Sequence, residues 1–184
     1  MKYTVNTKDE LQDIIQYICN INDKIDLNWI DTSHLEDMSN LFEYSSFNGN
    51  ISKWVVSNVK KMNFMFAYCK FNGNISKWDV SNVENMFAMF FNNDKFNKPL
   101  NNWNIQSVKN LSAMFHSSVF NKPLNNWDVS NVTDMNRMFQ YSLFNKDISN
   151  WNISVNCNRH NMFDNCPIKH KYMPELIRKY YDYE

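Results

Sequence analysis

The chain has 184 residues, and its 19 basic and 19 acidic residues give a formal net charge of zero. A balanced charge argues against proteins that bind nucleic acid or membrane surfaces, because those usually carry a basic excess. No apolar stretch approaches the roughly 18 residues of a membrane-spanning helix, so neither a nucleic-acid partner nor a membrane span is expected.

Residues 1–26 are expected to form an N-terminal cap, because they lack the repeat that follows them. Thr7-Lys8-Asp9-Glu10 matches a capping box, in which the first and last side chains satisfy free amides at the start of a helix. The next apolar residues recur at helical spacing: Leu11, Ile14, Ile15 and Ile18. A helix is therefore predicted over about residues 8–19. The polar segment 1–10 does not resemble a secretory signal, which favours a cytoplasmic location.

A motif of the form Ile/Leu-x-x-Trp-x-Val/Ile recurs with nearly constant spacing. Its tryptophans are 24, 25, 24 and 24 residues apart: Trp54, Trp78, Trp103, Trp127 and Trp151. A fixed period in this range is typical of a solenoid, in which each repeat forms one coil. Residues 27–168 are therefore expected to form six coils of about 24 residues each.

Each coil is predicted to contain a short strand and a short helical turn. The Trp-x-Val pair has the period of two that is typical of strands. Val132, Met135, Met138 and Phe139 follow at the spacing of one helix face. Glycine is limited to two positions, so asparagine is expected to supply the left-handed turn residues. The predicted fold class is a leucine-rich-repeat-like solenoid of short parallel β-strands and short helical turns.

The first coil departs from the pattern, because Trp29 lies one residue too early. Ile30 holds the inward tryptophan position when the register is corrected, and Leu27 precedes it by three residues. Trp29 is thereby expected in an outward column. Two interpretations remain open: the indole anchors a partner, or it packs under the N-terminal cap.

Residues 169–184 are predicted to form a C-terminal cap helix. Pro174 lies where the first turn of such a helix would begin, a position that proline favours. Solenoids need capped ends, because the terminal coils would otherwise expose their apolar faces.

The repeat resembles the BspA-like leucine-rich repeat family, in particular its DUF285 branch. The resemblance rests on Trp78-Asp79-Val80-Ser81-Asn82-Val83 through Met89-Phe90, repeated from Trp127 to Trp151, and covers roughly residues 27–168. It implies a sheet of short parallel strands, and a role in adhesion and protein binding with no catalytic residues. Members are mostly bacterial surface proteins, so the resemblance also allows a location at the cell surface or outside the cell.

The predicted function is non-enzymatic binding of a macromolecule, most naturally a protein, through the outward strand face. Strand alternation places the residues beside each inward Trp and Val on that face. The candidate contact residues are Trp29, Asp31, Lys53, Val55, Lys77, Asp79, Asn102, Asn104, Asn126, Asp128, Asn150 and Asn152. A glycan is an alternative ligand for the regular Asn and Ser rows.

A zinc site is the alternative in the last coil, because Cys157, His160, Cys166 and His170 have ligand types and spacing that zinc could use. Cys166, however, shares its column with Cys69, Ser118 and Ser142, where packing favours a small residue. The favoured interpretation is therefore structural, with no metal, no cofactor and no catalytic residue. The four scattered cysteines favour a reducing compartment over a disulfide scaffold.

Overall fold

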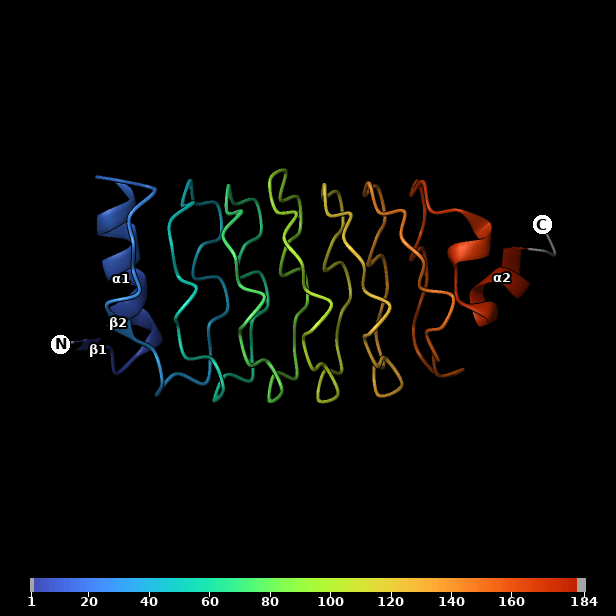
Figure 1. Ribbon diagram of the computed structural model, residues 1–184, viewed down its shortest axis with the longest axis horizontal. Helices are drawn as coiled ribbons and strands as arrows, with labels where there is room; N and C mark the ends of the chain where they lie inside the picture. Colours follow the sequence, from blue (N-terminus) through green and yellow to red (C-terminus); the bar gives the residue numbers. More distant parts are fainter. Residues whose placement is uncertain (1, 182–184) are drawn as a thin grey trace.

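The computed structural model describes residues 2–181 and contains five short elements of regular secondary structure. They are β1 (Tyr3–Thr4), α1 (Lys8–Cys19), β2 (Ile30–Asp31), the 3₁₀ helix η1 (His170–Tyr172) and α2 (Glu175–Tyr181). The long segment between β2 and η1 has no helix or strand and consists of turns and isolated bridges. Its backbone runs in successive circuits that lie side by side between the two helical ends (Figure 1).

The predicted fold class, a leucine-rich-repeat-like solenoid of short strands and helical turns, is wrong. The two strands have two residues each and pair only with one another, in parallel. The Trp-x-Val segments form no strand. The segments predicted as helices are interrupted by residues with positive φ, such as Phe64 (56°) and Arg137 (55°). A left-handed residue cannot continue a right-handed helix, so these segments fold as linked turns.

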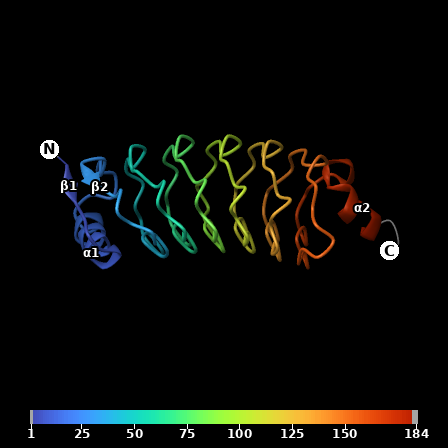
Figure 2. The same cartoon turned by 90° about the horizontal axis from the view of Figure 1, so that it is seen from below.

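Backbone hydrogen bonds at recurring positions connect neighbouring circuits, each of which we term a repeat turn. The amides of Met62 and Phe64 donate to the carbonyls of Asn85 and Phe87, both at 2.9 Å. The next amide along the chain, that of Met65, instead donates to Met62 O within the same repeat turn, at 3.2 Å. Alternate amides therefore donate to the neighbouring repeat turn and to the same repeat turn. The backbone groups are thus hydrogen-bonded without a continuous strand. Figure 2, seen from below, shows the row of similar circuits.

The five motif tryptophans are buried in equivalent positions of successive repeat turns, and none is more than 5% exposed. Each indole Nε1 donates to a backbone carbonyl of the preceding repeat turn, at 2.9 to 3.2 Å. Trp78, for example, donates to Ile51 O. The indole thus fills the core and satisfies its one polar group there. This bond also links each repeat turn to the one before it.

Two columns of phenylalanine rings run along the core beside the tryptophans. The first column is Phe42, Phe66, Phe90, Phe115, Phe139 and Phe163, with centroids 5.4 to 5.7 Å apart. The second is Phe47, Phe71, Phe96, Phe120 and Phe144, at 6.1 to 6.4 Å. Rings of the two columns stack on one another at 4.0 to 4.5 Å. Because such pairs add about 0.5–1.5 kcal/mol each beyond area burial, the repeat turns stabilise one another.

Asparagine side chains form a second set of links, at the corner that follows the second phenylalanine column. The Oδ1 of Asn48 accepts from Asn72 N at 2.8 Å, and Asn97 accepts from Asn121 N in the same way at 2.9 Å. Positive φ values, by contrast, occur at twelve non-glycine residues among those described, and only four of these are asparagine. Asparagine therefore acts here mainly as a bridge between repeat turns, and less as the predicted left-handed turn residue.

At the N-terminal end, α1 and β1 cover the first repeat turn. The helix begins after Thr7, whose hydroxyl accepts from the amide of Glu10 at 3.1 Å. Its side chains Leu11 and Ile15 are buried in the common core. The strand β1 pairs with β2, which begins at Ile30. Both elements therefore shield the end of the stack from water.

At the C-terminal end, η1 and α2 continue from the last repeat turn. The amide of Ile148 donates to Tyr172 O at 3.0 Å, which joins η1 to the stack. Ile177 of α2 is 5% exposed and belongs to the core. Residues 182–184 of the predicted C-terminal segment lie outside the described residues.

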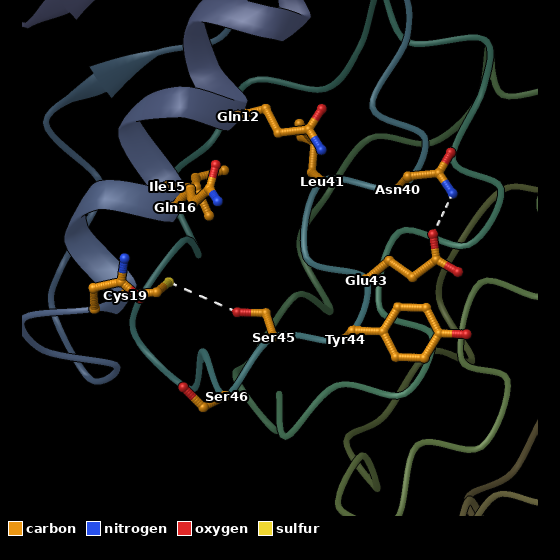
Figure 3. Close-up of a pocket in the computed structure, with 11 residues that line it drawn as sticks. Gln12, Ile15, Gln16, Cys19, Asn40, Leu41, Glu43, Tyr44, Ser45 and Ser46 are labelled. Carbon is orange, nitrogen blue, oxygen red and sulfur yellow. Dashed lines mark hydrogen bonds between the residues drawn. The ribbon is translucent and has the colours of Figure 1, made fainter.

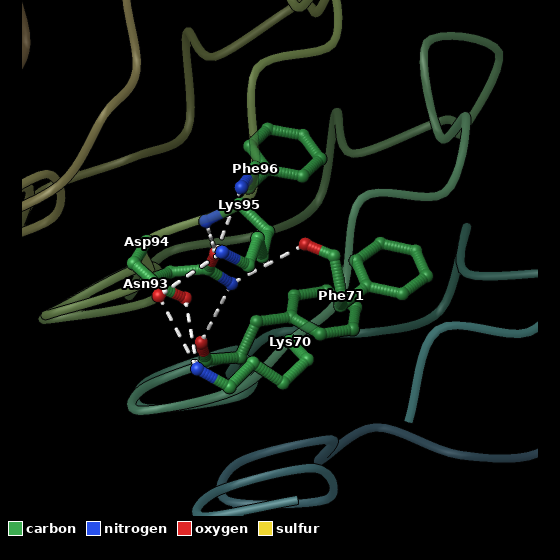
Figure 4. A network of polar contacts seen from close by, with 7 residues as sticks. Lys70, Phe71, Asn93, Asp94, Lys95 and Phe96 are labelled. Atoms are coloured by element: carbon green, nitrogen blue, oxygen red, sulfur yellow. Dashed lines mark hydrogen bonds and ion pairs between the residues drawn. The ribbon is translucent and has the colours of Figure 1, made fainter. Parts of the chain in front are cut away.

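The extra residue of the single 25-residue interval is accommodated between Asn93 and Phe96 (Figure 4). Asn93 is fully buried, and its Nδ2 donates to Phe66 O and Phe71 O at 3.2 and 3.4 Å. Its Oδ1 accepts from Lys95 N and Phe96 N at 3.0 and 2.8 Å. One buried amide side chain thus joins the longer loop to the preceding repeat turn and also holds the backbone within the loop.

Asp94 lies at the surface of the same loop, between two lysines. Its carboxylate is 3.2 Å from Lys70 Nζ of the preceding repeat turn and 3.3 Å from Lys95 Nζ. Burial acts to raise the pKa of Asp94, but the hydrogen bonds from Lys70 and Lys95 outweigh it and lower the pKa. The aspartate is therefore ionised near neutral pH.

Candidate functional site

The outward face, defined as the twelve candidate contact residues predicted above, is open to solvent. Eleven of these residues are exposed, and Asp31 is half-buried. Several of their side chains brace the local backbone: Asp128 Oδ1, for example, accepts from Ser130 N at 3.1 Å. Hydrogen bonds from Ser130 hold the pKa of Asp128 below its usual value. The face is therefore a polar surface with a fixed backbone.

Trp29 lies at the N-terminal end of the outward face and remains 41% exposed. Its ring makes an edge contact with Tyr3 of β1, with centroids 6.2 Å apart. The part of the N-terminal cap that contacts Trp29 is thus the strand β1, and this contact leaves much of the indole exposed to solvent. Tyr3 and Val55 are also exposed. We name Tyr3, Trp29 and Val55 the N-terminal apolar patch.

A shallow depression of about 340 Å³ lies further along the outward face. Its lining includes four of the predicted contact residues: Asn102, Asn104, Asn126 and Asp128. The structure thus places these four side chains around one small hollow between two repeat turns, and the hollow is lined mostly by amides.

A row of aromatic rings, which we term the aromatic row, follows the surface of five successive repeat turns. It consists of Tyr44, Tyr68, Phe91, His116 and Tyr141, with centroids 4.6, 5.3, 4.6 and 5.8 Å apart in that order. All three tyrosines are exposed, and Tyr44 is 71% exposed. Burial lowers the pKa of His116, so its ring is neutral near pH 7. The row is therefore an uncharged apolar ridge.

Sequence reasoning missed the aromatic row because its rings are divided between two adjacent columns. Tyr68 lies two residues after Phe66 of the first phenylalanine column, whereas Phe91 directly follows Phe90. A search of single columns at a fixed period therefore finds Tyr44, Tyr68 and Tyr141 in one column and Phe91 and His116 in the next, but no continuous row. A search of column pairs after each Met-Phe could have found the row.

A cleft of about 470 Å³ separates α1 from the first repeat turn and opens beside Tyr44 (Figure 3). Polar groups dominate its lining, among them Gln12, Gln16 and Glu43. Cys19 also lines it, and its sulfur lies 3.7 Å from Ser45 Oγ. Burial raises the pKa of this thiol, so the thiolate that nucleophilic catalysis needs is disfavoured.

The residues of the zinc alternative have other contacts. Cys166 Sγ donates to Phe144 O at 3.2 Å, and Cys157 Sγ donates to Asn158 O at 3.6 Å. Burial raises the pKa of both thiols, which opposes the deprotonation that zinc binding requires. Within residues 2–181, no three or more Cys, His, Asp or Glu side chains are grouped so that they could hold a metal ion.

A family model described as "Mycoplasma protein of unknown function, DUF285" matches residues 9–119 and, a second time, residues 69–173. The chain belongs to the DUF285 family. This confirms the DUF285 part of the resemblance, whereas the wider BspA-like assignment stays a prediction. Comparisons with curated proteins and with solved structures gave no match.

The two DUF285 matches together include the aromatic row and the whole outward face. Of the N-terminal apolar patch, only Tyr3 lies outside them. Both candidate surfaces are thus part of the DUF285 repeat region. In the described part of the chain, neither helix is long and apolar enough to cross a membrane.

Proposed function

We propose that this DUF285 protein is a non-enzymatic module that binds a protein partner. The aromatic row supports the proposal most directly. Tyrosine and other aromatic residues are enriched where partners bind, because they combine a large apolar area with few rotatable bonds. In a monomer with no partner, such a ridge would leave apolar surface in water over five repeat turns.

The outward face is the second contact surface in this proposal. Its N-terminal apolar patch offers Trp29 as an anchor, and the same face carries exposed polar residues such as Lys53 and Asp79. Interfaces commonly combine a small apolar centre with a polar rim. The resemblance to BspA-like proteins, which are linked to adhesion and protein binding, also supports this role.

The chemistry of the thiols supports a role without catalysis. Burial raises the pKa of Cys69 to about 12 and also raises the pKa of Cys19, Cys157 and Cys166. Each of them is therefore a thiol near neutral pH, whereas the thiolate is the nucleophilic form. The contacts of Cys157 and Cys166 give the zinc alternative no support.

Affinity capture with matched variants tests the proposal. Tyr68→Ala/Tyr141→Ala alters the aromatic row, and Trp29→Ala/Val55→Ala alters the outward face. Tyr17→Ala/Val155→Ala is the control, because both residues are exposed and lie on neither surface. We expect proteins recovered with the wild-type chain to be lost with the aromatic-row variant and retained with the control.

Unfolding curves of the same variants separate binding from stability. Because surface rings also stack on one another, each alanine is expected to cost about 0.5–1.5 kcal/mol of stability, which leaves the chain folded. If the wild-type chain recovers no partner, or if recovery survives both the aromatic-row and the outward-face substitutions, the proposal is wrong.

A further inference from the structure

We infer a binding site for an acidic polysaccharide, a sugar chain that carries carboxylate or sulfate groups, on the later repeat turns. The site is a lysine row that consists of Lys98, Lys122 and Lys146. It is separate from the aromatic row and adjoins the outward face at Asn150. It goes beyond the proposed protein-binding function.

The register of the repeat turns places these lysines in line. Each follows directly after an asparagine of the corner links: Asn121 N donates to Asn97 Oδ1 at 2.9 Å, and Asn145 N donates to Asn121 Oδ1 at 3.0 Å. Two residues before each lysine lies a ring of the second phenylalanine column, and these rings are 6.2 and 6.4 Å apart. The three lysines therefore recur at the spacing of the stack itself.

Within residues 2–181, the lysine row forms no ion pair with an acidic side chain. The one acidic side chain that adjoins the row in sequence is Asp147, whose Oδ1 accepts from Ser149 N at 2.9 Å. Aligned like charges repel one another, and an anionic ligand with repeated charges would relieve that repulsion.

The surrounding charge favours an anion at this end of the molecule. Residues 95–181 contain eleven Lys and Arg residues but five Asp and Glu residues, whereas residues 2–94 contain eight and twelve. The zero net charge of the chain therefore conceals an acidic N-terminal half and a basic C-terminal half. A positive field of this kind attracts polyanions to the later repeat turns.

The chemistry beside the lysines favours a sugar chain. A depression of about 470 Å³ lies next to Lys146, and its other lining residues are Pro123, Asn125, Asp147, Ser149 and Asn150. Amide and hydroxyl groups can exchange hydrogen bonds with sugar hydroxyls, while lysines pair with the acidic groups. No aromatic side chain lines this depression, so it lacks the stacking platform on which single-stranded nucleic acids usually depend.

Binding measurements with defined polymers test the site. The probes are dextran sulfate, polygalacturonate, uncharged dextran and a thymidine oligonucleotide, each titrated at low and at moderate salt. The variant Lys98→Gln/Lys122→Gln/Lys146→Gln removes the row, and Lys2→Gln/Lys24→Gln/Lys61→Gln removes the same charge from exposed positions in the N-terminal half. A third variant, with arginine at the three row positions, keeps the charge.

We expect the wild-type chain to bind one or both acidic polysaccharides, more weakly as salt rises, and not uncharged dextran. The row variant should bind about tenfold more weakly with a smaller salt slope, since fewer counterions are released. The arginine variant and the N-terminal control should stay close to the wild type. Equal losses in the row variant and the N-terminal control, tighter binding of the oligonucleotide, or binding of neither polysaccharide would overturn the assignment.

Discussion

The early and the later repeat turns differ at one corner of an otherwise common pattern. Two residues after Phe47 and Phe71 the chain has Gly49 and Gly73, whereas the same position after Phe96 holds Lys98. A Cβ at Gly49 would overlap the carbonyl oxygen of Ile25. The later corner instead carries a long side chain.

This difference shows that equivalent positions of the repeat do not offer the same room for a side chain. The buried columns repeat through the stack, so the core specifies the same residue types in every repeat turn. At the corners, the residue type depends on the local packing. The early repeat turns have no room for a side chain there, whereas the later ones carry a lysine. Surface chemistry can therefore change along the stack while the core stays constant.

The largest effect is expected from adding a methyl group at the early corner. Gly49→Ala should lower the free energy of unfolding by about 3 kcal/mol, because the rigid backbone of Ile25 must move. Gly73→Ala should cost less, since its nearest obstacle is the Phe71 ring at 2.5 Å. Lys122→Ala, at the later corner, should change stability by at most about 0.5 kcal/mol.

Equilibrium unfolding in urea measures the corner variants side by side. A loss in Lys122→Ala as large as that in Gly49→Ala would remove the distinction between early and later corners.

The second effect is expected at Asn93, on the boundary between the two regions. Asn93→Ala removes a buried amide that serves four backbone groups, so we expect a loss of about 2 kcal/mol. Asn102→Ala, on the exposed outward face, is the matched control and should be nearly neutral. Urea unfolding of both variants checks this, and a neutral Asn93→Ala would mean that the longer repeat turn is held by other contacts.

Much of the core could be predicted from the sequence, because periodicity identifies inward positions whatever the local backbone. Trp78, Val132 and Phe139, all in apolar positions predicted from the repeat, are buried. The local structure could not be predicted in the same way. Spacings of three and four residues arise in a helix, but they also arise from successive hydrogen-bonded turns. Only the positive φ at residues such as Ala88 distinguishes the linked turns from a helix. The alanine side chain does not indicate that conformation in the sequence.

The candidate surfaces were predictable to different degrees. Alternation beside the inward tryptophans located the exposed residues of the outward face, such as Asn102, although no strand forms there. The aromatic row could not be found column by column, because Tyr68 and Phe91 belong to neighbouring columns. The lysine row is visible in the sequence, but the reason for its restriction to later repeat turns is the space around Gly49 and Gly73.

A third effect should appear as a pH dependence that differs between Cys69, in the early repeat turns, and Cys166 in the last. Burial raises the pKa of Cys69 from 9.0 to about 12. The folded chain therefore keeps this proton between those values while the unfolded chain loses it. Stability is unaffected well below pH 9 and falls as the pH rises through it, by about 1.4 kcal/mol at pH 10.

Unfolding curves at pH 8 and pH 10 measure this slope in the wild type and in Cys69→Ala. The variant should lose the part of the slope that Cys69 contributes, whereas Cys166→Ala should lose less, because Cys166 is only half-buried. An unchanged slope in Cys69→Ala would show that its thiol ionises as freely in the folded chain as in the unfolded one.

The smallest effect is expected at Asp94, next to Asn93 in the boundary loop. Its ion pairs with Lys70 and Lys95 are half-exposed, so Asp94→Asn should cost at most about 0.5 kcal/mol. Because the pKa of Asp94 is lowered by folding, any contribution is present above pH 4 and is lost as the pH falls through its folded value. It should also shrink in high salt. Urea unfolding at two salt concentrations compares Asp94→Asn with Asn93→Ala. If the charge substitution costs as much as the buried amide, then surface ion pairs, and not the buried side chain, hold the two regions in register.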